Sequence, residues 1–161
     1  MLVIPAIDLR GGQCVRLKQG DYAQETIFNA DPGEQAQQFL DAGAKHLHLV
    51  DLDGARDGRP GNAAAITAVV ARCNAAGVPV QLGGGLRERE TIAAAFDLGV
   101  SRAIVGTRAI QDPDWFAAVA REFPGKVALG LDARDGQAAI AGWQHGGAVA
   151  ALDVLDRVAS L

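Results

Sequence analysis

Two aspartates that could carry out acid–base chemistry follow apolar segments far apart in the chain. Asp8 lies near the end of the segment 2–9, and Asp132 follows the segment 127–131. Carboxyl groups act as general acid and general base when their surroundings separate their pKa values. A pair that faced each other across one site could divide this work. The alternative is that each Asp only caps a loop, because Asp is common after strands.

Two glycine-rich segments follow two further apolar runs. Gly83, Gly84 and Gly85 come after residues 78–82, and Gly106 and Thr107 come after residues 102–105. Glycine lets backbone N–H groups approach an anion closely, and a helix start behind it adds a favourable dipole. On neighbouring strands these segments could hold one phosphate group. The alternative is that the glycines serve only to make turns.

Other polar residues lie near the same apolar runs. The basic residues Arg16, Lys18 and Arg87 could bind an anionic substrate or be solvated surface charges. His48 lies within the apolar segment 46–52, where a structural histidine is the alternative to a ligand-binding one.

Asp51, at the end of that segment, is the better candidate for a site, whereas Asp53 is expected in a loop. Trp143 lies in a Gly-rich segment. Its ring could anchor a packed loop, or it could be a surface on which a flat ligand stacks. The sequence alone leaves both alternatives open.

Short apolar segments alternate with amphipathic ones, which predicts a parallel α/β fold with strands buried on both faces. Strands are predicted at 2–9, 46–52, 78–82, 102–105 and 127–131, with a small extra strand at 13–18. Helices are predicted at 32–42, 63–76 with Asn62 as N-cap, 89–98, 112–121 and 148–160. Candidate site residues follow every strand, and no Gly-x-Gly-x-x-Gly follows the first. This favours a (β/α)8 barrel over a doubly wound open sheet.

A short repeat suggests how the five βα units relate to a barrel. The pattern Asp-x-Arg-x-Gly-Gln occurs at 8–13 and at 132–137, each time after an apolar strand, with an offset of 132 − 8 = 124 residues. We therefore expect one incomplete barrel domain over 1–161, made of a half-barrel at 1–124 and a fifth unit at 125–161. Doubling the offset gives roughly 248 residues, a usual barrel length.

Composition excludes several classes of protein. The chain has 161 residues, 49% of them hydrophobic, and a net charge of −4 without a long basic stripe, which argues against disorder and nucleic-acid binding. It has no apolar run of membrane-spanning length and no basic region of a signal peptide, so we expect a cytoplasmic protein. Cys14 and Cys73 fit neither a disulfide framework nor a zinc motif.

Six segments taken together resemble the histidine-biosynthesis isomerase family that acts on phosphoribosylformimino-aminoimidazole carboxamide ribotide. They are Ile-Pro-Ala-Ile-Asp-Leu at 4–9, Val-Arg-Leu-Lys-Gln-Gly at 15–20, His-Leu-Val-Asp-Leu-Asp-Gly-Ala at 48–55, Gln-Leu-Gly-Gly-Gly-Leu-Arg at 81–87, Val-Gly-Thr at 105–107 and Gly-Leu-Asp at 130–132. The resemblance implies a (β/α)8 (TIM) barrel of two similar halves. It also implies an Amadori rearrangement of an aminoaldose to an aminoketose, without metal or organic cofactor.

The resemblance also implies the role of each site residue. Asp8 would be the general base and Asp132 the general acid. The expected contacts with the bisphosphorylated ribotide come from Arg16, His48, Asp51, Trp143 and the residues of one phosphate site, Gly83, Gly84, Gly85, Arg87, Gly106 and Thr107. Trp143 would close over the substrate and stack on it.

One departure from the family is expected to matter. The family's second phosphate site belongs to loops after strands seven and eight, which this sequence does not contain. We expect a truncated chain, with a half-assembly completed by another copy or a non-catalytic relative as alternatives. A complete barrel is expected to be a monomer, whereas unpaired strand edges would favour self-association.

Three competing functions remain at this point. One is a non-catalytic phosphosugar-binding half-barrel, and another is an isomerase that also accepts phosphoribosyl anthranilate. The third is a synthase like the sister cyclase of the pathway, which the chain resembles less. That enzyme has Cys in the first-strand motif, where this chain has residues 6–8, and Lys near the position of Arg16.

Overall fold

The computed structural model describes residues 1–138 and 150–159. Its strands are β1 (Ala6–Arg10), β2 (Gln13–Lys18), β3 (Asp21–Asn29), β4 (Leu47–Asp51), β5 (Val80–Gly83), β6 (Arg102–Val105), β7 (Val127–Leu129), β8 (Ala133–Arg134) and β9 (Gln137–Ala138). Its helices are α1 (Pro32–Asp41), α2 (Leu52–Asp57), α3 (Ala63–Ala75), α4 (Arg89–Asp97), α5 (Thr107–Gln111), α6 (Pro113–Glu122) and α7 (Ala151–Ala159).

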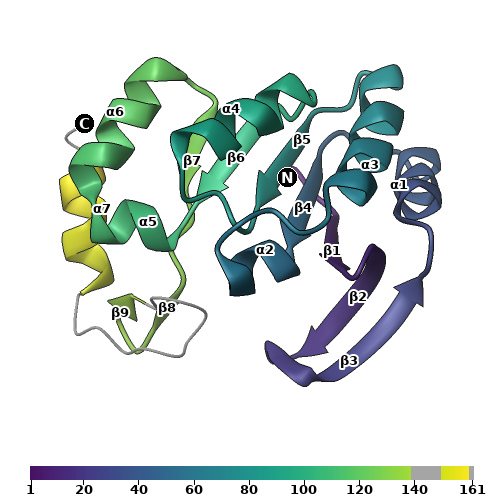
Figure 1. Ribbon diagram of the computed structural model, residues 1–161, viewed down its shortest axis with the longest axis horizontal. Coiled ribbons are helices and arrows are strands. Elements are labelled where there is room, and N and C mark those ends of the chain that lie inside the picture. The colour runs from purple at the N-terminus through teal and green to yellow at the C-terminus, as the bar shows by residue number, and fades with distance from the viewer. Residues whose placement is uncertain (139–149, 160–161) are drawn as a thin grey trace.

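The parallel strands follow one another across the sheet in chain order. The main sheet has the order β3-β2-β1-β4-β5-β6-β7, in which β1, β4, β5, β6 and β7 are parallel and β2 and β3 form an antiparallel extension. A doubly wound sheet reverses its strand order at a switch point. The described strands have no such reversal, so the doubly wound alternative is wrong and the winding is that of a βα barrel. In Figure 1 the first hairpin and α6 lie at opposite ends of the molecule.

The hydrophobic core lies between the helices and one face of the sheet. Strand residues such as Leu9, Leu49 and Val80 are fully buried, and they pack with helix residues such as Val69 and Ile92. The alternate strand residues face the other side and are only partly buried in β1 and β4. The prediction that the strands are buried on both faces is therefore wrong for the described residues. That second face carries Asp8 and His48.

Local signals place several helix starts where the sequence predicts them. The Asp31 carboxylate accepts the Glu34 N–H at 3.1 Å ahead of α1, and Asp112 accepts the Trp115 N–H at 3.0 Å ahead of α6. Pro follows each of these caps, at a position where no N–H is needed. Asn62 does stand at the N-cap of α3, but its side chain makes no capping hydrogen bond there. The predicted N-cap position of Asn62 is therefore confirmed, while the side-chain hydrogen bond usual at that position is not made.

Several elements lie outside the predicted pattern. Strand β3 pairs with β2, and α2 and α5 begin directly after β4 and at Thr107. Asp53 is part of α2, so its assignment to a loop is wrong. Helix α7 occupies the described part of the predicted helix 148–160.

Candidate active site

The candidate site residues gather at the carboxyl ends of the parallel strands. Asp8 lies in β1, Asp51 ends β4 and Gly83 ends β5, while Gly106 and Asp132 follow β6 and β7. In a parallel sheet these ends share one edge, so short loops bring the side chains into one region.

Asp8 lies half-buried on the sheet face away from the helices. It is opposite Val15 of β2 and Val50 of β4. Burial raises the pKa of the Asp8 carboxyl, an effect that the nearby charges of His48 and Arg16 oppose. A carboxylate with a raised pKa is the stronger base, which suits proton abstraction near neutral pH.

A cavity of about 390 Å³ opens beside Asp8, between β1, β2, β3 and α1. Its polar lining comes from Asp8, Arg16 and Gln35, and Phe28 and Phe39 contribute aromatic walls. Arg16 itself is exposed on β2. The structure thus brings Asp8, His48 and Arg16 together, as the sequence suggests for a base surrounded by polar substrate-binding groups.

His48 is held by a residue that the sequence analysis does not single out. The Gln81 amide Nε2 lies 3.0 Å from His48 Nδ1, across the β4–β5 pair in which the two residues are opposite each other. An amide nitrogen only donates, so Nδ1 accepts and the proton of neutral His48 resides on Nε2. Burial lowers the pKa of His48, whereas the Asp8 charge raises it. The cross-strand position of Gln81 is a signal available only once the register is known.

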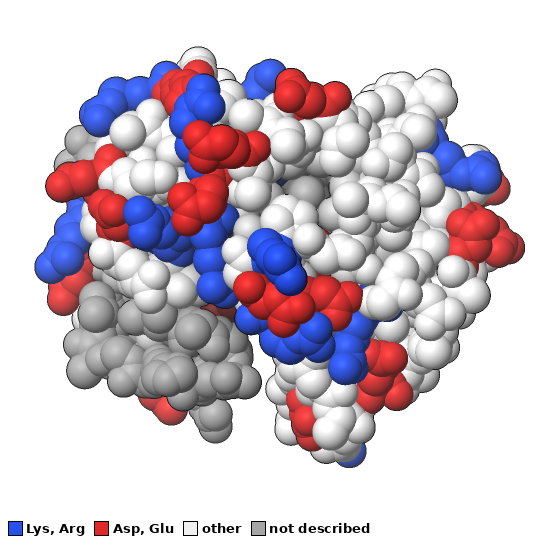
Figure 2. All heavy atoms as spheres, in the orientation of Figure 1, with Lys and Arg blue, Asp and Glu red and all other residues white. Residues whose placement is uncertain are grey.

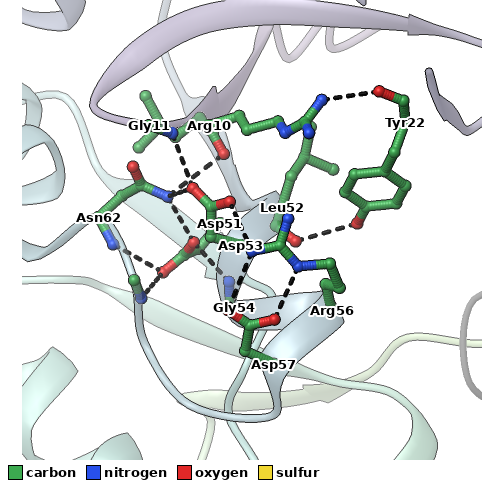
Figure 3. Close-up of polar contacts among 12 residues, drawn as sticks. Arg10, Gly11, Tyr22, Asp51, Leu52, Asp53, Gly54, Arg56, Asp57 and Asn62 are labelled. Atoms are coloured by element: carbon green, nitrogen blue, oxygen red, sulfur yellow. Dashed lines mark hydrogen bonds and ion pairs between the residues drawn. The ribbon is translucent and has the colours of Figure 1, made fainter. Parts of the chain in front are cut away.

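Asp51 is the centre of a buried hydrogen-bond network. Its side chain is 0% exposed, and its carboxylate accepts the N–H groups of Gly54 at 2.8 Å and Gly61 at 2.7 Å. It also accepts the backbone N–H of Asn62 at 3.2 Å and its side-chain Nδ2 at 2.7 Å. Figure 3 shows these donors converging on Asp51. With four donors in place, this carboxylate holds α2 and the loop before α3.

Asn62 and Asp53 extend the network to the turn after β1. Asn62 Oδ1 accepts the Gly12 N–H at 2.8 Å, and Asp53 Oδ2 accepts the Gly11 N–H at 2.7 Å. Asn62 Nδ2 lies 3.0 Å from Asp53 Oδ2. Sequence reasoning misses this role because an Asn ahead of a helix is usually a cap.

The glycine loop after β5 packs directly on α2. Gly84 and Gly85 have φ of +95° and +73°, and a Cβ on Gly84 would lie 2.1 Å from the backbone oxygen of Asp51. Arg87 Nη2 donates to Ala55 O at 2.9 Å, so its guanidinium helps to fix α2. The loop therefore needs glycine for close approach of backbones, whatever it binds.

The second glycine segment lies one strand further along the sheet. Gly106 immediately precedes α5, and β6 pairs in parallel with β5, with Gly83 opposite Ile104. Gly106, Thr107 and the loop 83–85 are thus on neighbouring strands, as the phosphate-site hypothesis requires. Trp143 lies outside the described residues.

Asp132 is exposed and follows β7 at the far end of the parallel strands. Three strands, β4, β5 and β6, separate β1 from β7. These four interstrand spacings amount to ~19 Å along the sheet. Because the sheet of a βα barrel curves, the straight-line separation of the two ends is shorter than this path along the sheet.

The two copies of Asp-x-Arg-x-Gly-Gln share the conformation of their turn. Gly11 and Gly12 have φ of +55° and +80°, and Asp135 and Gly136 have φ of +52° and +78°. Each pair is the turn of an antiparallel hairpin, β1–β2 and β8–β9, in which the Arg of the pattern is opposite the Gln. Two consecutive positive φ values are typical of the tight hairpin turn. The boundaries of the proposed halves, 1–124 and 125–161, remain a prediction.

Residues 1–138 and 150–159 were searched for membrane-spanning helices and for groups of metal-binding side chains. None of their helices is both long and apolar enough to cross a membrane, and they contain no group of three or more His, Cys, Asp or Glu placed to hold a metal ion. On the face in Figure 2, basic and acidic side chains interleave over α2 and the first hairpin, where Arg10 pairs with Glu25 and Arg56 with Asp57.

The fold and the site define an α/β protein of the βα-barrel class, with polar residues at the carboxyl ends of its parallel strands. Comparison with known proteins agrees: a family model described as "Histidine biosynthesis protein" matches residues 2–161. The chain belongs to this histidine biosynthesis family.

Three relatives that it matches carry the name 1-(5-phosphoribosyl)-5-((5-phosphoribosylamino)methylideneamino) imidazole-4-carboxamide isomerase. The protein of Bradyrhizobium diazoefficiens is 50% identical over 98% of this chain and 62% of its own length. That of Rhodopseudomonas palustris is 51% identical over 98% of this chain and 63% of its own length. That of Methylocella silvestris is 54% identical over 89% of this chain and 57% of its own length. The chain thus spans less than two thirds of the length of these relatives.

Proposed function

We propose that the chain carries the acid–base machinery of an aldose–ketose isomerase that converts the ribotide aminoaldose of histidine biosynthesis into its aminoketose. The observation that supports this most is about 50% identity to proteins named as that isomerase over 98% of the chain. The half-buried Asp8 in β1 and the glycine segments that follow the neighbouring strands β5 and β6 agree with it.

The proposed reaction needs one acid and one base. Asp132 donates a proton to the ribose ring oxygen, and the C1–O bond breaks to give a Schiff base at C1. Asp8 then removes the C2 proton. The electrons of the C–H bond form the C1=C2 bond of an enolamine, while the π electrons of the C1=N bond move onto the nitrogen. The C2 hydroxyl loses its proton and C1 gains one, which leaves the ketone at C2. Atoms are conserved overall, and no oxidant or organic cofactor is needed.

The remaining residues divide into binding and positioning roles. The glycine segments after β5 and β6 hold one phosphate of the ribotide with Thr107, while Arg16 and His48 contact the sugar beside Asp8. Trp143 stacks on the substrate. The four donors on its carboxylate lead us to give Asp51 a positioning role, in place of the direct contact expected from the sequence. We further infer a cytoplasmic protein that is monomeric as a complete barrel.

The test is turnover of the aminoaldose ribotide by the purified chain and by the chain fused to the C-terminal third of the Rhodopseudomonas palustris relative. Aminoketose is followed by chromatography. We expect turnover by wild type and its loss in Asp8→Asn and in Asp132→Asn. The control Asp114→Asn, on the exposed side of α6, should keep full activity. Failure of both wild-type forms to convert the ribotide would overturn the proposal.

The same experiment decides between the two other candidates. A phosphosugar-binding module is the second candidate, because the glycine segments after β5 and β6 lie on neighbouring strands, an arrangement that suits one phosphate. Calorimetric binding of the ribotide without turnover in either form would support that module. Turnover of phosphoribosyl anthranilate beside the ribotide would identify a bifunctional isomerase.

A further inference from the structure

We propose that Asn62 is a positioning residue that clamps the turn after β1 to α2, and so fixes the hairpin carrying Asp8 and Arg16. The inference rests on the proposed function, because it concerns the strand that holds the proposed base. It assigns a role to a residue that lies outside the six segments quoted above.

Asn62 stands at a helix start without acting as its cap. Asn at this position normally accepts an N–H of the first helical turn, yet the Asn62 side chain makes no such bond to α3. Instead the residue is only 4% exposed and points toward the carboxyl ends of β1 and β4 (Figure 3). A local preference given up in favour of tertiary contacts is typical of functional sites.

The Asn62 amide joins three segments that are distant in sequence. Its Oδ1 accepts the Gly12 N–H, and its Nδ2 is 2.7 Å from Asp51 Oδ1, 3.0 Å from Asp53 Oδ2 and 3.4 Å from Leu9 O. An amide alone offers a donor and an acceptor in one planar group of this size. A neutral donor between the carboxylates of Asp51 and Asp53 also relieves their repulsion. Replacement by Asp removes the donor and adds a third negative charge beside Asp51 and Asp53.

The clamped turn sets the register of the β1–β2 hairpin, which carries Asp8 and Arg16. Gly11 and Gly12 both have positive φ, and the pairs that follow are Arg10 with Gln13 and Asp8 with Val15. A slip of one residue would move every side chain of β2 to the other face. The clamp therefore fixes on which side of Asp8 the Arg16 guanidinium lies.

The clamp also connects the proposed base to the proposed phosphate loop. Asp53 and Asp51 belong to α2 and its N-cap, and the Arg87 guanidinium of the β5–α4 loop donates to Ala55 O of the same helix. Helix α2 is thus fixed on one side to the turn after β1 and on the other to the glycine loop. A loosened clamp would change where Asp8 points relative to a ligand held by its phosphate.

The first test uses the chain itself and needs no turnover. In Asn62→Ala, we expect hydrogen exchange of the Gly12 amide, measured by NMR, to accelerate at least about tenfold, because its acceptor is gone. In Asn62→Asp, the Gly12 amide should exchange as fast as in Asn62→Ala, although an Asp carboxylate can still accept a hydrogen bond from the Gly12 N–H. The control is Asn74→Ala in the same helix, which removes one exposed bond to Gly99 O and should leave Gly12 protected. A protected Gly12 amide in Asn62→Ala, or wild-type protection in Asn62→Asp, would overturn the clamp.

The second test separates positioning from mere stability. We expect Asn62→Ala to lower kcat by about tenfold to a hundredfold with KM for the ribotide changed less than about threefold, because the phosphate loop remains while the base is misaligned. If Asn62→Ala fails to fold, Asp53→Ala replaces it: Gly11 exchange should rise, Gly12 should stay protected, and kcat should fall less. Faster exchange with unchanged kcat would overturn the positioning role. Absence of turnover in wild type would instead count against the proposed function, with the clamp still decided by exchange.

Discussion

Replacing Gly84 by Ala tests the close approach of the glycine loop to α2. Ala at this position must adopt a φ of +95°, and its Cβ would lie 2.1 Å from the carbonyl oxygen and 2.8 Å from the carbonyl carbon of Asp51. The matched control is Gly43→Ala, because Gly43 has a φ of +87° and no atom within 4 Å of an added Cβ. The two substitutions share the backbone strain, and only Gly84→Ala adds the clash.

The expected magnitudes follow from this difference. The left-handed conformation costs a residue with a Cβ about 1–2 kcal/mol, so Gly43→Ala should lower the free energy of unfolding by that amount. At Gly84 the obstacle is backbone rather than a flexible side chain, and overpacking adds typically about 1–3 kcal/mol or more. We therefore expect Gly84→Ala to be destabilised by at least about 1 kcal/mol beyond Gly43→Ala.

Urea denaturation measures both variants on the same scale. The midpoint should fall further for Gly84→Ala while the slope m stays unchanged, which identifies a change in stability rather than in the denatured state. Equal destabilisation, within about 0.5 kcal/mol, would refute the packing of the loop against the end of β4. The phosphate-site hypothesis would then lose its rigid support.

Three further outcomes are expected. Burial raises the pKa of Asp8, so its charged form opposes folding, and Asp8→Asn should raise Tm at pH 7. This gain in Tm should vanish as the pH falls below 3.8, the ordinary pKa of Asp. An equal Tm of the two proteins at pH 7 would contradict this. Burial and the charge of Asp31 raise the pKa of Cys14 to about 11, and burial also raises the pKa of Cys73. Neither thiol should therefore react with iodoacetamide at pH 8 before urea unfolds the chain. Alkylation of the native protein would contradict their burial. Nitrogen NMR should find the proton of neutral His48 on Nε2 in the wild type. In Gln81→Glu the proton should move to Nδ1, because a carboxylate can only accept a hydrogen bond. The same tautomer in both proteins would exclude Gln81 as the residue that sets the tautomer of His48.

The sequence predicts the βα units well because each has a strong local cause. The apolar runs at 102–105 and 13–18 coincide with β6 and β2, and the Asp112–Pro113 start of α6 is confirmed by the cap bond to Trp115. Strand β3 is not predicted, because it is an edge strand with mostly exposed, polar residues. Helix α2 is too short to form on its own, and it depends on the tertiary contacts of Asp51.

The candidate site is predictable in outline but not in its supporting contacts. Asp8 and the glycine segments stand out because each follows or ends an apolar run, which marks the carboxyl end of a strand. Asn62 and Gln81 escape notice, because their roles depend on which loop and which strand they meet after folding. The sequence places Asp51 at the end of a strand, as the structure does, but its burial under four donors depends on contacts with α2 and the loop before α3.

The most direct measurement of the central claim is the fate of the C2 hydrogen of the aminoaldose ribotide in D₂O, followed by proton NMR. The chain and its fusion are compared with their Asp8→Asn variants. We expect wild type to remove the C2 hydrogen as the aminoketose forms, and Asp8→Asn to leave it in place while the ribotide still binds. Loss of the C2 hydrogen at the wild-type rate in Asp8→Asn would contradict the assignment of Asp8 as the base.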